Sequence, residues 1–232
     1  MERVVISLDG PSGSGKGLIG SMMAKEFSLK YFQSSLIYRG LAYICMSRNI
    51  APEETEKIIK IARSLDIVQA TENIDLNTEE IGNFTSKISS ILEVRNIISF
   101  CLKDIVRNNH RILMEGRDIG SVIAPDADLK LFITADIITR AKRRYKQLCL
   151  EGKSCILSDV LNLMRERDKR DSLRKSSPLE IPHDAILVDT SNLSPEKVIE
   201  KIKSSMVNHK NADDLLRLFN LNAEKWHYFS EN

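Results

Sequence analysis

A run of seven residues near the start of the chain has the composition of a phosphate-binding loop. Residues 10–16, Gly-Pro-Ser-Gly-Ser-Gly-Lys, match the pattern G-x-x-x-x-G-K. The glycines of such a loop let successive backbone N–H groups point at one anion, and the following helix adds its positive end. The lysine reaches the outer phosphates of the nucleotide. The residues predicted to bind ATP are Gly10, Pro11, Ser12, Gly13, Ser14, Gly15, Lys16, Gly17 and Leu18.

The two residues after the lysine lack a hydroxyl group. Gly17 and Leu18 stand where P-loop proteins usually carry a Ser or Thr that binds Mg²⁺. We therefore expect the Mg²⁺ that accompanies ATP to be held mainly by phosphates and water, without a direct protein ligand. A carboxylate such as Glu115 can assist. The chain contains no NKxD sequence, which argues against a signalling GTPase.

Two further stretches place cations where a second anion can bind. Ser34, Tyr38 and Arg39 lie at the predicted start of a helix, and Arg117 and Asp118 follow a predicted strand. Ligands of open α/β sheets bind at the carboxyl ends of strands, and an arginine can hold a phosphate with two N–H groups. The alternatives are an ordinary surface helix start for the first stretch and an Arg–Asp turn pair for the second.

A charged segment, residues 165–175, carries three side chains at helical spacing. Arg167, Asp171 and Arg174 are separated by four and three residues, so a continuous helix puts them on one face. A solvated charged helix is the alternative interpretation. A second basic run supplies three arginines that we expect to act on phosphate from a lid, Arg140, Arg143 and Arg144. Phosphoryl transfer needs such cations because negative charge spreads over the migrating group.

Short apolar runs alternate with amphipathic stretches of helical length. They predict strands at residues 4–8, 111–115, 129–133 and 185–189, and helices at 16–27, 91–106, 136–150, 157–170 and from 195 onward. This alternation predicts an α/β fold with a parallel β-sheet core flanked by helices. Residues 66–83 mix β-prone and turn-prone types and predict a small antiparallel ribbon. The chain from about residue 209 is apolar enough for a docked terminal helix or a partner contact.

Composition narrows the class of protein. The chain has 232 residues, of which 42% are hydrophobic, enough for one large domain with a sizeable core. Its 34 basic and 32 acidic residues give a net charge of +2, which offers no indication of nucleic-acid or membrane binding. Four cysteines without CxxC or metal-ligand spacing suggest reduced thiols, and no apolar run approaches the roughly 20 residues that span a bilayer. We expect a cytoplasmic monomer.

Taken together, these motifs resemble those of the bacterial-type cytidylate kinases, a family of P-loop nucleoside-monophosphate kinases. The likeness runs from about residue 3 to 205 and rests on five stretches in the same order: 10–17, 34–39, 86–95, 115–120 and 167–174. It implies a P-loop kinase fold with a small inserted acceptor-binding subdomain and a short lid. It also implies Mg²⁺ as the cofactor that accompanies ATP.

The resemblance assigns roles to residues of this chain. It implies that Ser86, Arg95, Asp118 and Arg174 face the cytosine, and that Asp171 and Arg167 approach the ribose and phosphate. The residues implied to hold CMP are Ser34, Tyr38, Arg39, Ser86, Arg95, Arg117, Asp118, Arg167, Asp171 and Arg174. Those expected to be catalytic are Lys16, Arg117 and Arg167.

Four positions depart from the family pattern. Gln33 and Glu115 each stand where the family favours Asp, Leu92 where Pro usually stands, and Asn77 where an Arg is expected. These departures bear on acceptor affinity and base selectivity more than on the phosphate chemistry.

We expect the chain to transfer the γ-phosphoryl group of ATP to CMP or dCMP, giving ADP and CDP or dCDP. One alternative is another small-metabolite or nucleoside-monophosphate P-loop kinase. The other is a nucleotide-binding regulatory module without turnover, which Leu18 and the apolar tail favour. The expected organisation is a P-loop domain over residues 1–208, with an acceptor-binding insert at 34–95 and a lid region at 145–160. Residues 209–232 are an apolar C-terminal extension of unknown role.

Overall fold

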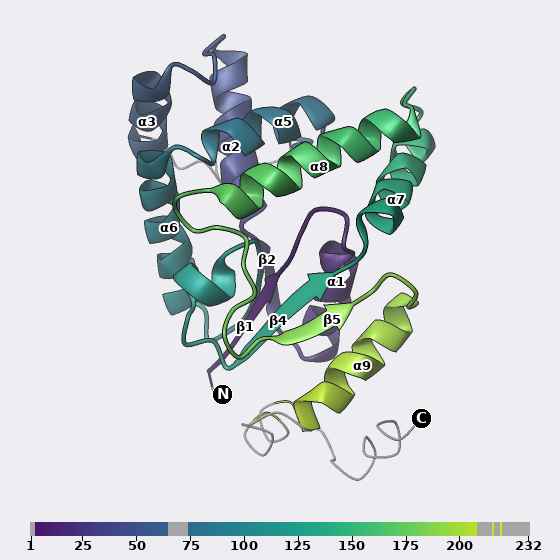
Figure 1. Ribbon diagram of the computed structural model, residues 1–232. Helices are drawn as coiled ribbons and strands as arrows, with labels where there is room; N and C mark the ends of the chain where they lie inside the picture. Colours follow the sequence, from purple (N-terminus) through teal and green to yellow (C-terminus); the bar gives the residue numbers. More distant parts are fainter. Residues whose placement is uncertain (1–2, 65–73, 208–214, 216–218, 220–232) are drawn as a thin grey trace.

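The core of the molecule is one sheet of parallel strands. The computed structural model describes residues 3–64, 74–207, 215 and 219. Over these residues the sheet has five strands in the order β2-β3-β1-β4-β5. The strands are β1 (Val4–Asp9), β2 (Lys30–Gln33), β3 (Arg111–Glu115), β4 (Leu129–Thr134) and β5 (Ile186–Asp189) (Figure 1). The predicted parallel α/β fold is confirmed.

Helices cover both faces of the sheet, and the alternation of β1 shows why. Val4, Ile6 and Leu8 point into a core that includes side chains of α1 (Lys16–Glu26) and α9 (Pro195–Val207). Val5 points into a second core on the opposite face of the sheet, formed with four helices that lie between β2 and β3 in the sequence. Since successive side chains of a strand face opposite sides, a strand buried on both faces is apolar along most of its length, as β1 is apart from Ser7 and Asp9. The first strand therefore joins the two halves of the core.

The helices of the second core form the upper part of the molecule in Figure 1. α2 packs against α3 and α5, and α3 packs against α6. Their bounds are α2 (Ser35–Ser47), α3 (Thr55–Ser64), α5 (Glu79–Ile88) and α6 (Leu92–Arg107). These helices occupy most of the segment for which an acceptor-binding insert is predicted, residues 34–95.

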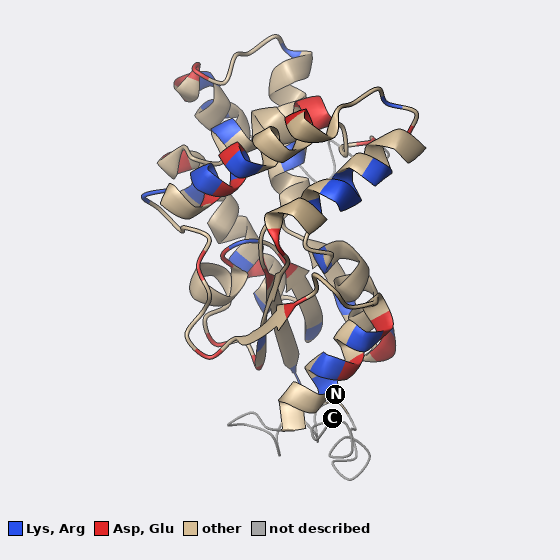
Figure 2. Ribbon diagram, turned by 45° about the vertical axis from the view of Figure 1, so that its right-hand side comes forward, with Lys and Arg blue, Asp and Glu red and all other residues tan. Residues whose placement is uncertain are grey.

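The next two helices form an antiparallel pair beside the phosphate loop. α7 (Ile137–Leu150) and α8 (Leu157–Leu173) pack through a small core of their own, formed by Ala141, Leu148, Val160 and Met164. The predicted lid region, residues 145–160, covers the turn between them. Basic and acidic residues are interspersed along the helices in the view of Figure 2, in keeping with the small net charge. No helix in the described part of the chain combines the length and apolar character needed to cross a bilayer.

Three expectations are corrected or limited. The antiparallel ribbon predicted at residues 66–83 is wrong for its described part, because residues 74–78 form no strand and the helix α5 begins at Glu79; residues 66–73 lie outside the described residues. The edge strand β2 was not predicted. Most of the expected terminal helix also lies outside the described residues. Leu215 and Phe219, however, are buried in the core beside α1. The ring centres of Phe219 and Phe27 lie 4.7 Å apart.

Candidate active site

The phosphate loop connects β1 to α1 and depends on its glycines. A Cβ atom at Gly10 would lie 1.9 Å from the carbonyl oxygen of Ile133 on β4, so any other residue would push the loop off the sheet. Gly15 precedes α1 with φ of 94°, a conformation that side-chain-bearing residues rarely adopt. The strand, loop and helix predicted around the G-x-x-x-x-G-K pattern are thus present.

Lys16 begins α1 and turns back over this loop. Its Nζ donates to the carbonyl oxygen of Pro11 at 2.7 Å, and the side chain of Ser14 lies 3.4 Å away. Burial, together with the nearby charge of Arg117, lowers the pKa of Lys16 to about 7. An anion at the mouth of the loop would offset both effects, because it favours the charged form of the amine.

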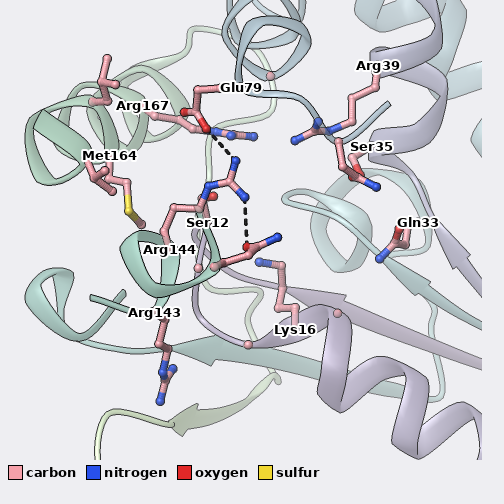
Figure 3. Close-up of a pocket in the computed structure, with 18 of the residues that line it drawn as sticks. Ser12, Lys16, Gln33, Ser35, Arg39, Glu79, Arg143, Arg144, Met164 and Arg167 are labelled. Carbon is pink, nitrogen blue, oxygen red and sulfur yellow. Dashed lines mark hydrogen bonds and ion pairs between the residues drawn. The ribbon is translucent and has the colours of Figure 1, made fainter. Parts of the chain in front are cut away.

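A cavity of 550 Å³ opens over the loop, and its charge is strongly unbalanced. Two carboxylates line it, those of Glu79 and Glu115. Six cationic side chains line it as well: Lys16, Arg39, Arg117, Arg143, Arg144 and Arg167 (Figure 3). They come from the phosphate loop, α2, the end of β3, α7 and α8. Such a cavity suits a ligand with several negative charges.

The side of the cavity nearest Gly17 holds the carboxylate of Glu115. Tyr31 donates a short hydrogen bond to its Oε2, and Gln33 donates to the Tyr31 hydroxyl at 3.0 Å. Burial and the charge of Glu115 raise the pKa of Tyr31, so the phenol stays a donor. Both family departures in this region therefore lie in one hydrogen-bonded cluster. The carboxylate of Glu115 lines the cavity, and a carboxylate can accept hydrogen bonds from water bound to a cation such as Mg²⁺.

The three arginines predicted for the lid have different surroundings. Arg140 is buried and donates to the carbonyl oxygens of Ala135 (2.8 Å) and Ser12 (3.1 Å) and to the carboxylate of Asp168 (2.7 Å), and it does not line the cavity. It ties the phosphate loop to α8. Arg143 and Arg144 do line the cavity.

Arg143 and Arg144 are held by groups from other elements. Arg143 donates to the hydroxyl and the carbonyl oxygen of Thr190, at 2.9 and 2.6 Å. Arg144 donates to Glu79 on α5 at 2.6 Å and so bridges α7 to the opposite wall of the cavity (Figure 3).

The residues implied to read the base form a buried cluster behind β3. Arg95 donates to Asp118 Oδ2 at 3.0 Å, and both side chains are nearly inaccessible to solvent. The guanidinium carbon of Arg95 lies 5.8 Å from the centre of the Tyr38 ring. Burial raises the pKa of Tyr38 to about 12. Arg174 is close enough to affect the pKa of Tyr38. Residues far apart in the sequence thus meet in one place.

A second cluster lies along α8. Asp171 accepts from Arg117 Nε at 3.3 Å and lies 3.7 Å from Arg174 Nη1, so it joins the end of β3 to the end of α8. Arg167 lines the cavity from the same helix, and burial together with the charge of Arg117 lowers its pKa to about 10. Ser86 is also buried here, where it accepts from Arg170 at 3.0 Å.

Several donors in these clusters have no partner within the described part of the chain. The Nε atoms of Arg95, Arg167 and Arg174 are buried without a hydrogen bond. Buried donors of this kind cost free energy unless a ligand or water satisfies them. Three of the predicted acceptor-site residues therefore have unused hydrogen-bonding capacity.

The remaining predicted acceptor residues lie at the start of α2. Ser34 is buried, and a Cβ on Gly116 would lie 2.7 Å from its hydroxyl, so these two loops can approach only because Gly116 lacks a side chain. Arg39 lines the cavity and donates to the carbonyl oxygen of Leu76 at 2.6 Å.

The structure adds residues that sequence reasoning missed. Asp9, Asp168 and Thr190 hold site residues or site loops in place, and Glu79 pairs with Arg144. Each of these four residues contacts an element distant in the sequence, so the sequence around it does not predict that contact. Only Asp9 carries a signal: it is a carboxylate that ends an apolar strand directly before the phosphate loop.

A phosphate loop, a surrounding set of arginines and an adjoining polar cluster define a P-loop kinase that phosphorylates a small acceptor. The family model for cytidylate kinase matches residues 6–208, and the chain belongs to the cytidylate kinase family. The curated cytidylate kinase of Rickettsia felis is 50% identical over 207 residues, which cover 89% of this chain and 93% of that protein. That of Rickettsia africae is 48% identical over the same shares of each chain.

Among solved structures, an uncharacterized protein from Eubacterium ventriosum aligns with a TM-score of 0.51. The alignment covers 86% of this chain and 96% of that one, at 15% identity. This likeness concerns the fold alone.

Proposed function

We propose that the chain catalyses transfer of the γ-phosphoryl group of ATP to CMP or dCMP, giving ADP and CDP or dCDP. The proposal rests on one observation, which is that two sites lie next to each other at the end of β3. The cationic cavity over the phosphate loop meets the buried Arg95–Asp118 pair through Arg117 and Asp171. Neither another metabolite kinase nor a module without turnover is favoured by the relatives, which carry the name cytidylate kinase.

The donor site neutralises charge. Lys16 and the backbone of the phosphate loop are suited to the β- and γ-phosphates of ATP, with Arg143 beside them. Arg117 and Arg167 lie between the phosphate loop and the acceptor cluster, where they can stabilise the migrating phosphoryl group. An in-line displacement mainly needs positioning and charge stabilisation, so no covalent intermediate is required. Mg²⁺ bound to ATP would supply further charge, and we assign the carboxylate of Glu115, which lines the cavity, to its water shell.

The acceptor site reads the base through hydrogen bonds. Arg95 occupies Oδ2 of Asp118, so we assign Oδ1 to the exocyclic amine of cytosine. Arg174 and Ser86 are assigned to the acceptor atoms of the ring, and Asp171 and Arg167 to the ribose and phosphate. Such a site disfavours a base with a different donor pattern, because its buried polar groups would be left unpaired.

A panel of nucleoside monophosphates tests this function. The purified protein is mixed with ATP, Mg²⁺ and one of CMP, dCMP, UMP, AMP or GMP, and ADP formation is followed. CMP and dCMP should react fastest. The matched control is Lys16→Ala, which should lower kcat by at least about 100-fold, the scale of losing one transition-state stabiliser. Faster turnover of AMP than of CMP would overturn the acceptor assignment.

The cellular setting is also proposed here. We propose a monomer in the cytoplasm with ATP and the pyrimidine nucleotide as its ligands; the four cysteines form no disulfide, in keeping with a reducing compartment. Sedimentation of the purified protein tests the oligomeric state directly.

A further inference from the structure

The turn that carries Arg117 and Asp118 runs into a single turn of π-helix, η1 (Ile119–Ile123). The first N–H groups of a helix have no partner inside it and need acceptors from elsewhere. An aspartate directly before a helix commonly supplies one with its own carboxylate. Asp118 holds that position but makes no such bond, because its carboxylate is paired with Arg95.

Asp9 supplies the missing acceptors from another element. Its Oδ1 accepts from the backbone N–H of Ile119 at 2.9 Å, and its Oδ2 accepts from that of Gly120 at 2.7 Å. Asp9 is completely buried at the end of β1, immediately before the phosphate loop. Both carboxylate oxygens are thus directed at the two residues that follow Asp118.

We propose that Asp9 is a positioning residue for the acceptor base: by accepting the first N–H groups of η1, it leaves the carboxylate of Asp118 available to cytosine. The same two bonds fix the turn that holds the acceptor site to the strand that holds the donor loop. This inference rests on the proposed function and extends it to a residue that touches neither nucleotide.

Asp9→Asn is the direct test. An amide has one acceptor oxygen, and its NH₂ group would face the second N–H donor, so one of the two bonds is lost. The carboxylate of Asp118 then has an unsatisfied N–H group beside it and competes for that donor. We expect KM for CMP to rise by about 10- to 100-fold, the loss of roughly one charge-assisted bond, while KM for ATP changes by less than about threefold. The preference for CMP over UMP should fall as well.

Asp128→Asn is the matched control. Asp128 Oδ2 accepts from the backbone N–H of Val5 at 2.8 Å, so it makes the same kind of bond at the opposite end of β1. The amide of this variant keeps one acceptor oxygen for the N–H of Val5, so it should change neither KM. Hydrogen exchange adds a readout independent of turnover: the amides of Ile119 and Gly120 should exchange faster in Asp9→Asn and at the wild-type rate in Asp128→Asn.

A second variant covers the case in which Asp9→Asn does not fold. The Cβ of Gly120→Ala would lie 2.7 Å from Ser7 Oγ and 3.4 Å from Asp9 Oδ2, so it should move the turn while leaving Asp9 intact. It should reproduce the selective rise in KM for CMP. Equal changes in both KM values, or unchanged exchange at Ile119 and Gly120, would overturn the role of Asp9. A wild-type protein that does not phosphorylate CMP would instead refute the proposed function, and the exchange comparison would still decide whether Asp9 holds η1.

Discussion

Lys16 differs from the arginines around it because it can lose its charge near neutral pH. Burial brings its pKa to about 7, whereas a guanidinium remains charged. At pH 8 much of the unliganded protein therefore carries a neutral Lys16. Bound phosphates raise the pKa of the amine again, because they favour its charged form.

Binding of each ATP molecule at pH 8 should accordingly be accompanied by uptake of about one proton. Titration calorimetry in buffers of different ionisation enthalpy measures this number directly. Lys16→Ala should show no such uptake even at nucleotide concentrations that saturate it. Equal proton uptake by the two proteins would mean that another group titrates.

Asp118 is the residue to which we assign recognition of the cytosine amine. Its removal in Asp118→Ala should raise KM for CMP far more than KM for ATP, with a loss of about 10- to 150-fold in kcat/KM for one charge-assisted bond. Discrimination against UMP should fall, because the intact carboxylate repels the carbonyl group of uracil. If Asp118 only orients the turn, CMP and UMP would lose activity by the same factor, and steady-state kinetics with both nucleotides separates the two cases.

Leu18 stands in the position of the missing Mg²⁺ ligand. Its side chain is 55% exposed and lines the cavity, which argues against the idea that it is a packed core residue. Leu18→Thr should therefore keep or modestly raise activity, lower the Mg²⁺ concentration needed for half-maximal rate, and leave Tm unchanged. A Mg²⁺ dependence identical to that of the wild type would show that a hydroxyl at this position does not reach the ion.

Helix α7 carries arginines with different roles. Arg140 is buried and Asp168 is its carboxylate partner, so Arg140→Ala leaves a partly buried charge and two carbonyl groups without a donor. We expect a loss of about 2–4 kcal/mol, or about 4–16 °C in Tm for a protein of this size. Arg143 lies about one turn further along α7 and lines the cavity, so Arg143→Ala should instead lower kcat with a small change in Tm. Thermal denaturation and kinetics of both variants check this division.

The elements that were predicted correctly are those with a strong local pattern. The helix expected at residues 91–106 is α6 (Leu92–Arg107), since its apolar side chains recur at helical spacing and point into one core. β2 was missed because only Tyr31 and Phe32 separate Lys30 from Gln33 and the strand pairs on one side only, with β3. The ribbon predicted up to residue 83 overlaps the start of α5, although Thr78 caps this helix by accepting from the backbone N–H of Ile81 at 3.2 Å.

The parts of the candidate site that could be predicted are likewise those with a recognisable sequence pattern. The phosphate loop could be predicted because its residues are consecutive, and the proximity of Arg95 and Asp118 because a family resemblance supplies their spacing. The contacts of Asp9, Asp168 and Thr190 could not be predicted, because each joins segments that only the folded chain brings together.

At the scale of the whole molecule, the C-terminal extension adds to the core beside α1. Leu215 and Phe219 are buried there, and a buried side chain of either type contributes about 1.5–3 kcal/mol before the cost of ordering the chain. Truncation after residue 208 should lower Tm by several degrees and leave KM for both nucleotides unchanged. Leu215→Ala combined with Phe219→Ala in the full chain should reproduce the effect. A truncated protein with the wild-type Tm would show that these side chains contribute nothing to stability.

The strand order also has a consequence for how the protein is made. β1 leaves the ribosome before the other strands of this sheet but is the central one, where Val4 pairs with Arg111 and Ile6 with Leu129. At about 5–20 residues per second, its first neighbour is synthesised on the order of ten seconds later. During that interval an apolar strand with two open edges has no native partner, a state that favours misassociation. The nascent chain should therefore depend on chaperones until β3 has emerged.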